Sequence, residues 1–132
     1  MKEKLEKVLK NAYSPYYNFK VGSIVVMKDG SEFIGVNVEN ANGTSICAER
    51  HAIGSAIAHG YKKGDFDRIY VMLENGEFGT PCFACRQVIL EFFDKDSKVI
   101  CVNKNGEEKK YTVSELCPFP FDSEDLKWKV DL

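Results

Sequence analysis

The sequence predicts an α/β protein, a three-layer α/β/α sandwich around one mixed five-stranded sheet. Two observations predict this class. The hydrophobic periodicity changes from segment to segment, so that helical stretches alternate with short β-branched runs. Some neighbouring runs are separated only by tight turns, which give antiparallel hairpins, whereas others are separated by a helix, which gives a parallel crossover. Helices on both faces of a single sheet satisfy both kinds of connection.

The first half of the chain is expected to form a helix, a hairpin and a second helix. Residues 1–13 alternate lysine and glutamate around apolar positions at helical spacing, which predicts an amphipathic helix. The β-branched runs at 21–27 and 31–38 flank the turn Lys28-Asp29-Gly30 and predict a hairpin. Residues 47–60, CAERHAIGSAIAHG, predict a helix with small residues on its packing face.

The second half repeats the alternation. RIYVML at 68–73 predicts a strand, PCFACRQVILEFF at 81–93 a helix, and the runs at 98–103 and 109–113 a second hairpin around an Asn-Gly turn. The tail from residue 117 is expected to be irregular. It carries Phe119, Phe121 and Trp128, which need burial in the domain or in a neighbouring subunit.

Length and composition exclude several classes of protein. A chain of 132 residues with 44% hydrophobic and 29% charged residues is expected to form one domain, 1–132, of a water-soluble globular protein. No apolar run approaches the ~18 residues of a membrane span, and the N-terminus is not a signal peptide, so we expect a cytoplasmic protein without a membrane partner. A net charge of −2 gives no sign of a nucleic-acid partner.

The five cysteines are the next observation, because a cytoplasmic protein does not use them as a disulfide framework. Thr80 is expected to be an N-cap with Pro81 at the first helical position, which places Cys82 and Cys85 on one face of a helix start. The positive end of the helix dipole stabilises thiolates there, and the thiolate is the form that binds metal.

A second helix is expected to begin in the same way. Thr44 or Ser45 can cap it, so that Cys47 and Glu49 fall in its first turn. Three thiolates can then meet between two helix starts. Zinc held by three protein ligands keeps a fourth position for water, as in catalytic sites, whereas structural sites usually close with a fourth Cys or His.

Other interpretations of these residues stay open at this point. The Cys-x-x-Cys pair alone is also typical of a redox motif. Cys101, in an apolar strand, is expected to be a core residue, and Cys117 is an alternative fourth thiolate for a closed structural site. His51 and His59 are expected to be solvent or packing residues and not ligands.

The cysteines lie in motifs that resemble a known family. CAER at 47–50 followed by PCFACRQ at 81–87 resembles the paired zinc motif of the cytidine deaminases. Three further segments, at 12–22, 35–41 and 115–126, resemble that family's substrate-side segment, ribose-binding strand end and C-terminal segment. The resemblance covers nearly the whole chain, and its segments come in the right order.

The resemblance implies a reaction and its machinery. It makes Cys47, Cys82 and Cys85 the ligands of one Zn²⁺ per chain and Glu49 the proton shuttle. The implied activity is hydrolytic deamination of cytidine and deoxycytidine in pyrimidine salvage. Zinc lowers the pKa of its bound water toward ~7 and Glu49 would move the protons. Arg50 is implied to donate hydrogen bonds to the ligand sulfurs and so to withdraw negative charge.

The resemblance also implies the contacts to a nucleoside substrate. Asn37 and Glu39 would hold the ribose hydroxyl, Phe19 and Val21 would form the wall around the base, and Ala48 would be a further contact. Phe121 would come from a neighbouring subunit of a homotetramer with active sites at its interfaces. The chain departs from the family in having one residue fewer and no tyrosine between Asn37 and Cys47, and in having Phe83 where glycine is usual.

Two other functions are compatible with these motifs. Deaminases of modified nucleosides such as blasticidin S share the zinc motifs and the shortened loop, but Glu39 matches the ribose-binding acid of the cytidine enzymes. A non-enzymatic, zinc-stabilised interaction protein would have Cys117 in the fourth position of the metal. Editing of a polynucleotide is least expected, because no basic surface would neutralise phosphates.

Overall fold

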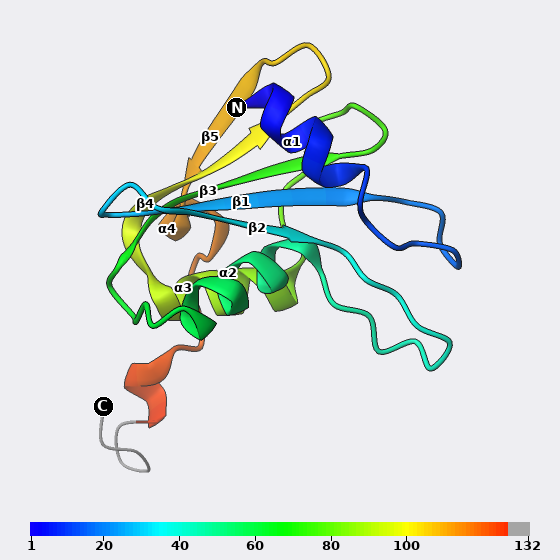
Figure 1. The fold of residues 1–132 in the computed structure, drawn as a ribbon. Helices are drawn as coiled ribbons and strands as arrows, with labels where there is room; N and C mark the ends of the chain where they lie inside the picture. Colours follow the sequence, from blue (N-terminus) through cyan, green and yellow to red (C-terminus); the bar gives the residue numbers. More distant parts are fainter. Residues whose placement is uncertain (127–132) are drawn as a thin grey trace.

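The sandwich predicted from the sequence is present in the structure, a computed structural model that describes residues 1–126 (Figure 1). Trp128 lies outside the described residues. The elements are α1 (Lys2–Leu9), β1 (Val21–Met27), β2 (Glu32–Val36), α2 (Ala48–Ala58), β3 (Phe66–Leu73), α3 (Phe83–Phe92), β4 (Phe93–Val102), β5 (Glu108–Thr112), α4 (Val113–Leu116) and a 3₁₀ helix (Ser123–Leu126).

The five strands form one mixed sheet in the order β2-β1-β3-β4-β5. Only the β3–β4 pair is parallel, because α3 crosses over between these strands, and the other pairs are antiparallel. Helix α1 covers one face of the sheet, and α2 and α3 cover the other (Figure 1). The three layers expected from the alternation of periodicities are therefore confirmed.

Two hydrophobic clusters fill the spaces between the layers. Leu5 and Ile24 belong to the cluster under α1, whereas Val25 and Ile53 belong to the cluster under α2 and α3. Adjacent strand residues such as Ile24 and Val25 point to opposite faces, so each central strand contributes to both clusters. This double burial explains why β1 reads as an almost unbroken apolar run.

The topology places two helix starts at the same edge of the sheet. Strands β2 and β3 are both antiparallel to β1, so they run in the same direction. Helix α2 follows β2 and helix α3 follows β3, and each helix therefore begins beyond the carboxyl end of its strand. This is the edge where α/β sheets place their ligands.

Two short elements near the C-terminus were not predicted: α4, which lies before the tail expected to be irregular, and the 3₁₀ helix Ser123–Leu126 within that tail. Residues 113–116 form α4, with a capping box in which Thr112 accepts a hydrogen bond from the backbone of Glu115 and the Glu115 side chain accepts one from the backbone of Thr112. The T-x-x-E spacing that signals this box is present in the sequence. Among residues 1–126, no helix is long and apolar enough to cross a lipid bilayer.

Candidate active site

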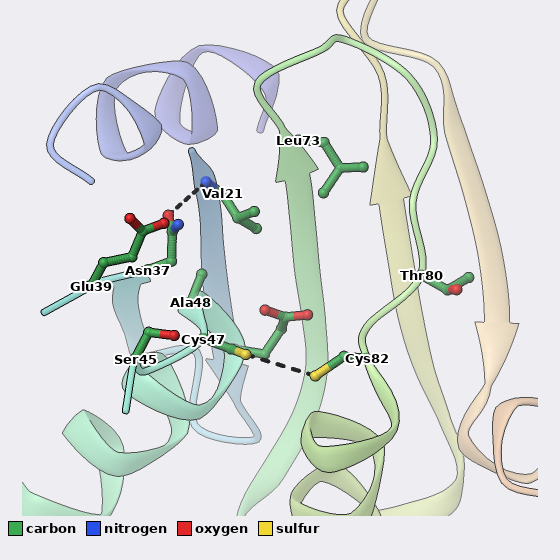
Figure 2. Close-up of a pocket in the computed structure, with 10 residues that line it drawn as sticks. Val21, Asn37, Glu39, Ser45, Cys47, Ala48, Leu73, Thr80 and Cys82 are labelled. Atoms are coloured by element: carbon green, nitrogen blue, oxygen red, sulfur yellow. Dashed lines mark hydrogen bonds between the residues drawn. The ribbon is translucent and has the colours of Figure 1, made fainter. Parts of the chain in front are cut away.

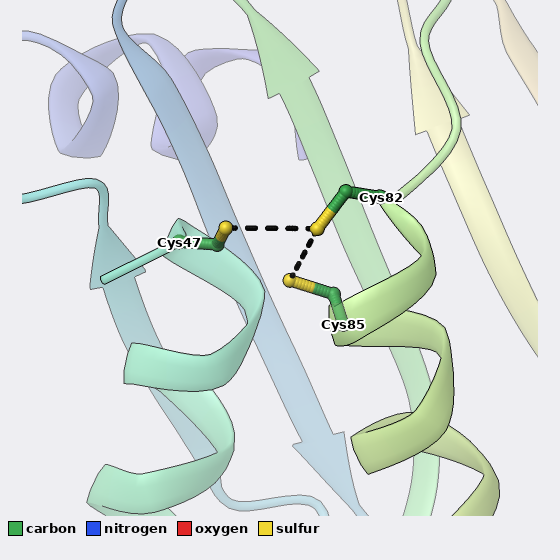
Figure 3. Close-up of side chains that lie close together, drawn as sticks. All are labelled: Cys47, Cys82 and Cys85. Carbon is green, nitrogen blue, oxygen red and sulfur yellow. Dashed lines mark hydrogen bonds between the residues drawn. The ribbon is translucent and has the colours of Figure 1, made fainter. Parts of the chain in front are cut away.

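Two helix starts bring three cysteines together, as the sequence predicted (Figure 3). Cys47 is the N-cap of α2, Cys82 is the N-cap of α3, and Cys85 lies in the first turn of α3. The sulfur of Cys82 lies 3.7 Å from that of Cys47 and 3.4 Å from that of Cys85. All three sulfurs are within 4.8 Å of one another.

The predicted caps of these helices are wrong. Thr80 is not the N-cap of α3, because its hydroxyl accepts a hydrogen bond of 2.8 Å from Arg86 Nη2. Thr44 is not the N-cap of α2, because its hydroxyl is bonded to the side chain of Asn40 at 3.1 Å. Both helices begin after a cysteine, so the ligand sulfurs stand at the positive helix ends themselves.

The spacing of the sulfurs fits a zinc ion. Tetrahedral Zn–S bonds of about 2.3 Å place the sulfurs about 3.8 Å apart, close to the 3.7 and 3.4 Å that separate the Cys82 sulfur from those of Cys47 and Cys85. Within residues 1–126, no fourth Cys, His, Asp or Glu joins the group. Cys117 lies elsewhere, with its sulfur 3.7 Å from the carbonyl oxygen of Arg86, and Cys101 is buried in β4 as expected. A metal held here would keep an open fourth position.

The thiols differ in their readiness to ionise. Burial raises the pKa of Cys85, and the negative charge of Glu49 adds to the effect. Burial also opposes ionisation of Cys82, but hydrogen bonds from Cys85 and Cys47 outweigh it and leave the pKa of Cys82 below its usual value. Deprotonation of Cys85 is therefore coupled to binding of a cation.

Arg50 supplies positive charge beside the sulfurs. Its Nη2 atom lies 3.3 Å from the sulfur of Cys47, and this hydrogen bond, with another to Cys85, raises the pKa of Arg50. The Nε atom is buried without a hydrogen-bond partner in the described part of the chain. The guanidinium is thus held toward the thiol cluster, where it offsets the negative charge of the thiolates.

Glu49 places a buried carboxyl group next to the thiols. Its side chain is 5% exposed and lines the same pocket as Cys47 and Cys82. Burial raises the pKa of Glu49 above its ordinary value, although its own backbone N–H and the charge of Arg50 oppose the shift. A carboxyl group with a raised pKa can both accept and donate a proton near neutral pH.

Cys47 and Cys82 lie together on one side of a pocket of about 200 Å³, away from Asn37 and Glu39 (Figure 2), and Glu49 also lines this pocket. Its walls combine the ends of β1, β2 and β3 with the starts of α2 and α3. The lining residues are Val21, Asn37, Glu39, Ser45, Cys47, Ala48, Glu49, Leu73, Thr80 and Cys82. Ser45, Leu73 and Thr80 were not predicted as lining residues. The position of Leu73 at the carboxyl end of β3 is a signal that would have found it.

Glu39 and Asn37 line the same pocket on the side away from Cys47 and Cys82. The buried Glu39 carboxylate accepts hydrogen bonds from the hydroxyl of Ser14 and from the backbone N–H groups of Tyr16 at 2.9 Å and Tyr17 at 3.1 Å. Burial alone would raise the pKa of Glu39, but these hydrogen bonds lower it below its usual value. Glu39 is therefore held as an anion at the pocket wall.

Asn37 connects the pocket to the start of β1. Its Oδ1 accepts a hydrogen bond of 2.8 Å from the backbone of Val21, and its Nδ2 donates one of 2.8 Å to the carbonyl oxygen of Phe19. The side chain of Asn37 thus orders the wall that Val21 contributes. Each of its two polar atoms keeps capacity for one more hydrogen bond.

Two predicted substrate contacts do not line the pocket of a single chain. Phe19 is 37% exposed, and it is tied to Asn37 through its backbone and not through its ring. Phe121 is 61% exposed, and its carbonyl oxygen accepts a hydrogen bond of 2.7 Å from Gln87. The role of Phe121 in a neighbouring subunit stays a prediction.

Thiol ligands that leave a metal's fourth position open, next to a carboxyl group able to transfer protons, define a hydrolytic enzyme of the zinc deaminase class. Comparison with known proteins identifies the family within this class. Residues 1–111 match the family model described as the cytidine and deoxycytidylate deaminase zinc-binding region. The chain belongs to this family.

Relatives and solved structures agree with this assignment. The chain is 43% identical over 116 residues to a cytidine deaminase of Halalkalibacterium halodurans, covering 87% of this chain and 86% of the relative. It is 40% identical to a probable cytidine deaminase of Dictyostelium discoideum, covering 91% and 80% respectively. The crystal structure of cytidine deaminase from Burkholderia pseudomallei is similar with a TM-score of 0.85 and 41% identity, covering 90% of this chain and 94% of that one.

Proposed function

We propose that this protein hydrolyses the 4-amino group of cytidine and deoxycytidine, releasing ammonia with uridine or deoxyuridine. One observation carries the proposal: the buried carboxyl group of Glu49 lies beside an open three-thiol cluster in a pocket whose other end presents Asn37 and Glu39. The amino group of the base would therefore lie beside Glu49 and the thiol cluster, and the sugar would lie beside Asn37 and Glu39.

Cys47, Cys82 and Cys85 would hold one zinc ion per chain. When bound, the ion would supply a water molecule made acidic by the metal charge. Arg50 would limit the negative charge that three thiolates place on the site, because it donates to Cys47. By this donation Arg50 would help the site to keep such a water reactive near neutral pH.

Glu49 would carry the protons of the reaction. Its carboxylate would take a proton from the attacking water and donate it to N3 of the base, as the C4–O bond forms. A second proton would then go through Glu49 to the leaving amine, and the C4–N bond would break to release ammonia. The raised pKa of Glu49 suits a group that must act as base and as acid in one cycle.

The sugar would be held at the opposite end of the pocket. Glu39 accepts three hydrogen bonds from residues 14–17, which leaves about one free lone-pair direction for a ribose hydroxyl. Asn37 would assist through its remaining hydrogen-bonding capacity. Val21 and Ala48 would contact the base and the sugar as parts of the wall.

The proposal extends to the oligomeric state and the cellular role of the enzyme. We propose a homotetramer in which Phe121 completes the site of a neighbouring chain, because Phe119 and Phe121 are 102% and 61% exposed in a single chain. Phe19 would meet the base only after such assembly. We also propose a role in pyrimidine salvage in the cytoplasm, where the thiols would remain reduced.

A comparison of four substrates tests this function. Ammonia release is measured side by side with cytidine, deoxycytidine, free cytosine and blasticidin S. Turnover of cytidine and deoxycytidine, with cytosine much poorer because it cannot use Glu39 and Asn37, is the expected result. Preference for blasticidin S would show that the substrate is a modified nucleoside and not cytidine. Absence of any turnover by zinc-loaded protein would contradict it.

A further inference from the structure

Arg86 makes three hydrogen bonds through its guanidinium, and none of them belongs to the ladder of its own helix. It donates from Nε to the carbonyl oxygen of Pro81 at 2.8 Å and from Nη2 to the hydroxyl of Thr80 at 2.8 Å. It also donates from Nη1 to the carbonyl oxygen of Leu116 at 3.1 Å. The guanidinium carbon lies 4.4 Å from the centre of the Phe83 ring. One side chain thus joins two segments that lie far apart in the sequence.

The first two bonds hold the segment that enters the active site. Thr80 lines the pocket, and Pro81 directly precedes Cys82, one of the three clustered thiols. Residues 78–82 belong to no helix or strand, although the backbone N–H of Arg86 donates to the carbonyl oxygen of Cys82 at 2.9 Å, the first bond of α3. The Arg86 side chain adds bonds to Pro81 and Thr80, the two residues before Cys82, and so helps to set the position of Cys82 relative to Cys47.

The third bond holds the C-terminal segment. Leu116 ends α4, and the chain continues from it to Phe121. The sulfur of Cys117 contacts the carbonyl oxygen of Arg86 at 3.7 Å, and the neighbouring Gln87 donates to the carbonyl oxygen of Phe121 at 2.7 Å. Two consecutive residues of α3 thus anchor the segment 116–121.

We infer that Arg86 is a positioning residue that holds Thr80 and Cys82 in the geometry of the site and links them to the C-terminal segment. This inference rests on the proposed function. Arg86 touches neither the sulfurs nor the pocket interior: it acts through the backbone of Pro81 and the side chain of Thr80. Residues that orient metal ligands in this way usually change metal affinity or activity about 10- to 100-fold when they are replaced.

The geometry requires arginine at this position. The three acceptors lie in different directions around one planar group, and the guanidinium also stacks on Phe83. A lysine side chain has one ammonium nitrogen in place of the three guanidinium nitrogens, so it would reach only some of the three acceptor oxygens. Arg86→Lys should consequently give an intermediate effect, and Arg86→Gln, which loses the charge and most donors, should give the full effect.

Zinc release provides a readout that a merely structural role would not change. Zinc-loaded parent and variants are mixed with a chromogenic chelator, and the release rate is followed without nucleoside. We expect Arg86→Gln to release zinc about tenfold or more faster than the parent, with Arg86→Lys between them. The value of kcat/KM per zinc-loaded site should fall in the same order.

Two further variants keep the inference testable if Arg86→Gln folds poorly. Thr80→Val removes only the Nη2 acceptor and should also accelerate zinc release. Gln87→Met, the matched control on the same helix, leaves the bonds to Thr80 and Pro81 intact and should release zinc at the parent rate. A role confined to stability would lower the unfolding midpoint of the Arg86 variants while zinc release and kcat/KM stay within about twofold of the parent. That result would overturn the inference, and because release is measured without nucleoside, it leaves the choice of substrate untouched.

Discussion

Gly35 of β2 lies directly against Ala48 of α2: a Cβ atom at position 35 would be 2.3 Å from the carbonyl oxygen of Ala48. It would lie equally close to the backbone nitrogen of Ala52. The helix therefore packs on the strand with no side chain between them. Cys47 and Glu49 flank Ala48, so this contact sets how deeply both groups enter the site.

The first prediction is that Gly35→Ala disrupts the site by moving α2. The added methyl group meets backbone on the facing helix, which cannot rotate away, and overpacking of this kind typically costs about 1–3 kcal/mol. Urea unfolding should show this loss, and kcat/KM should fall because Glu49 and Cys47 move with the helix. Gly54→Ala is the control. Gly54 lies in α2, and a Cβ atom added there would meet no neighbouring atom within 4 Å, so alanine should stabilise the protein by up to about 1 kcal/mol. A stable, fully active Gly35→Ala variant would contradict this role of the contact.

The sequence predicts the layers of this fold better than its close contacts. The alternation of periodicities was sufficient for the sandwich, since Ile24 and Val25 must point to opposite faces. It was not sufficient for the helix starts, because Thr80 matches a general N-cap pattern but is engaged by Arg86. That engagement depends on Arg86, about one turn into α3, and on the tertiary position of Leu116.

The candidate site shows a similar division. The spacing of Cys47, Cys82 and Cys85 was sufficient to predict their cluster, because local helix geometry fixes two of them and the topology brings the third. The hydrogen bonds that hold Glu39 come from the loop at 14–17, and no local pattern predicts them. The role proposed for Phe121 depends on contacts with a neighbouring chain, and no pattern within one sequence specifies such contacts.

A second prediction concerns the metal. Purified protein should contain about one zinc per chain, and Cys82→Ala should lose most of it, because two remaining thiolates bind far more weakly. Cys117→Ala is the control and should keep the zinc, since its sulfur lies outside the cluster. Elemental analysis of both variants checks this. Loss of zinc from Cys117→Ala would instead indicate a closed structural site.

A third prediction concerns stability at low pH. The pKa of folded Glu39 is lowered, so its hydrogen bonds contribute stability that is complete above the unfolded pKa of about 4.3 and is lost as the pH falls through the folded value. Glu39→Gln cannot ionise and should lack this contribution. Denaturant unfolding from about pH 6 to about pH 3 should show a shallower acid loss for the variant than for the parent. An equal acid loss of stability in the parent and in Glu39→Gln would show that the ionised Glu39 does not contribute to stability.

A fourth prediction concerns assembly. Glu49→Gln and Phe121→Ala chains should each be nearly inactive, and the second should keep its zinc because Phe121 is neither one of the three thiol ligands nor part of the pocket lining of its own chain. Refolded together, they should regain activity, since some sites would combine an intact Glu49 with a neighbour's intact Phe121. Native mass spectrometry verifies the mixed oligomers, because Phe121→Ala chains are lighter by a phenyl group. No recovery within them, or full activity of a monomer, would remove Phe121 from the site.

The central claim is that Glu49 performs the proton transfers beside a zinc ion held by the three cysteines. The most direct test compares the parent and Glu49→Gln at equal zinc content, with ammonia release from cytidine as the measurement. The amide occupies the same space but cannot shuttle protons, so we expect one zinc per chain in both proteins and a loss of several orders of magnitude in kcat in the variant. Turnover of zinc-loaded Glu49→Gln close to that of the parent would contradict the claim.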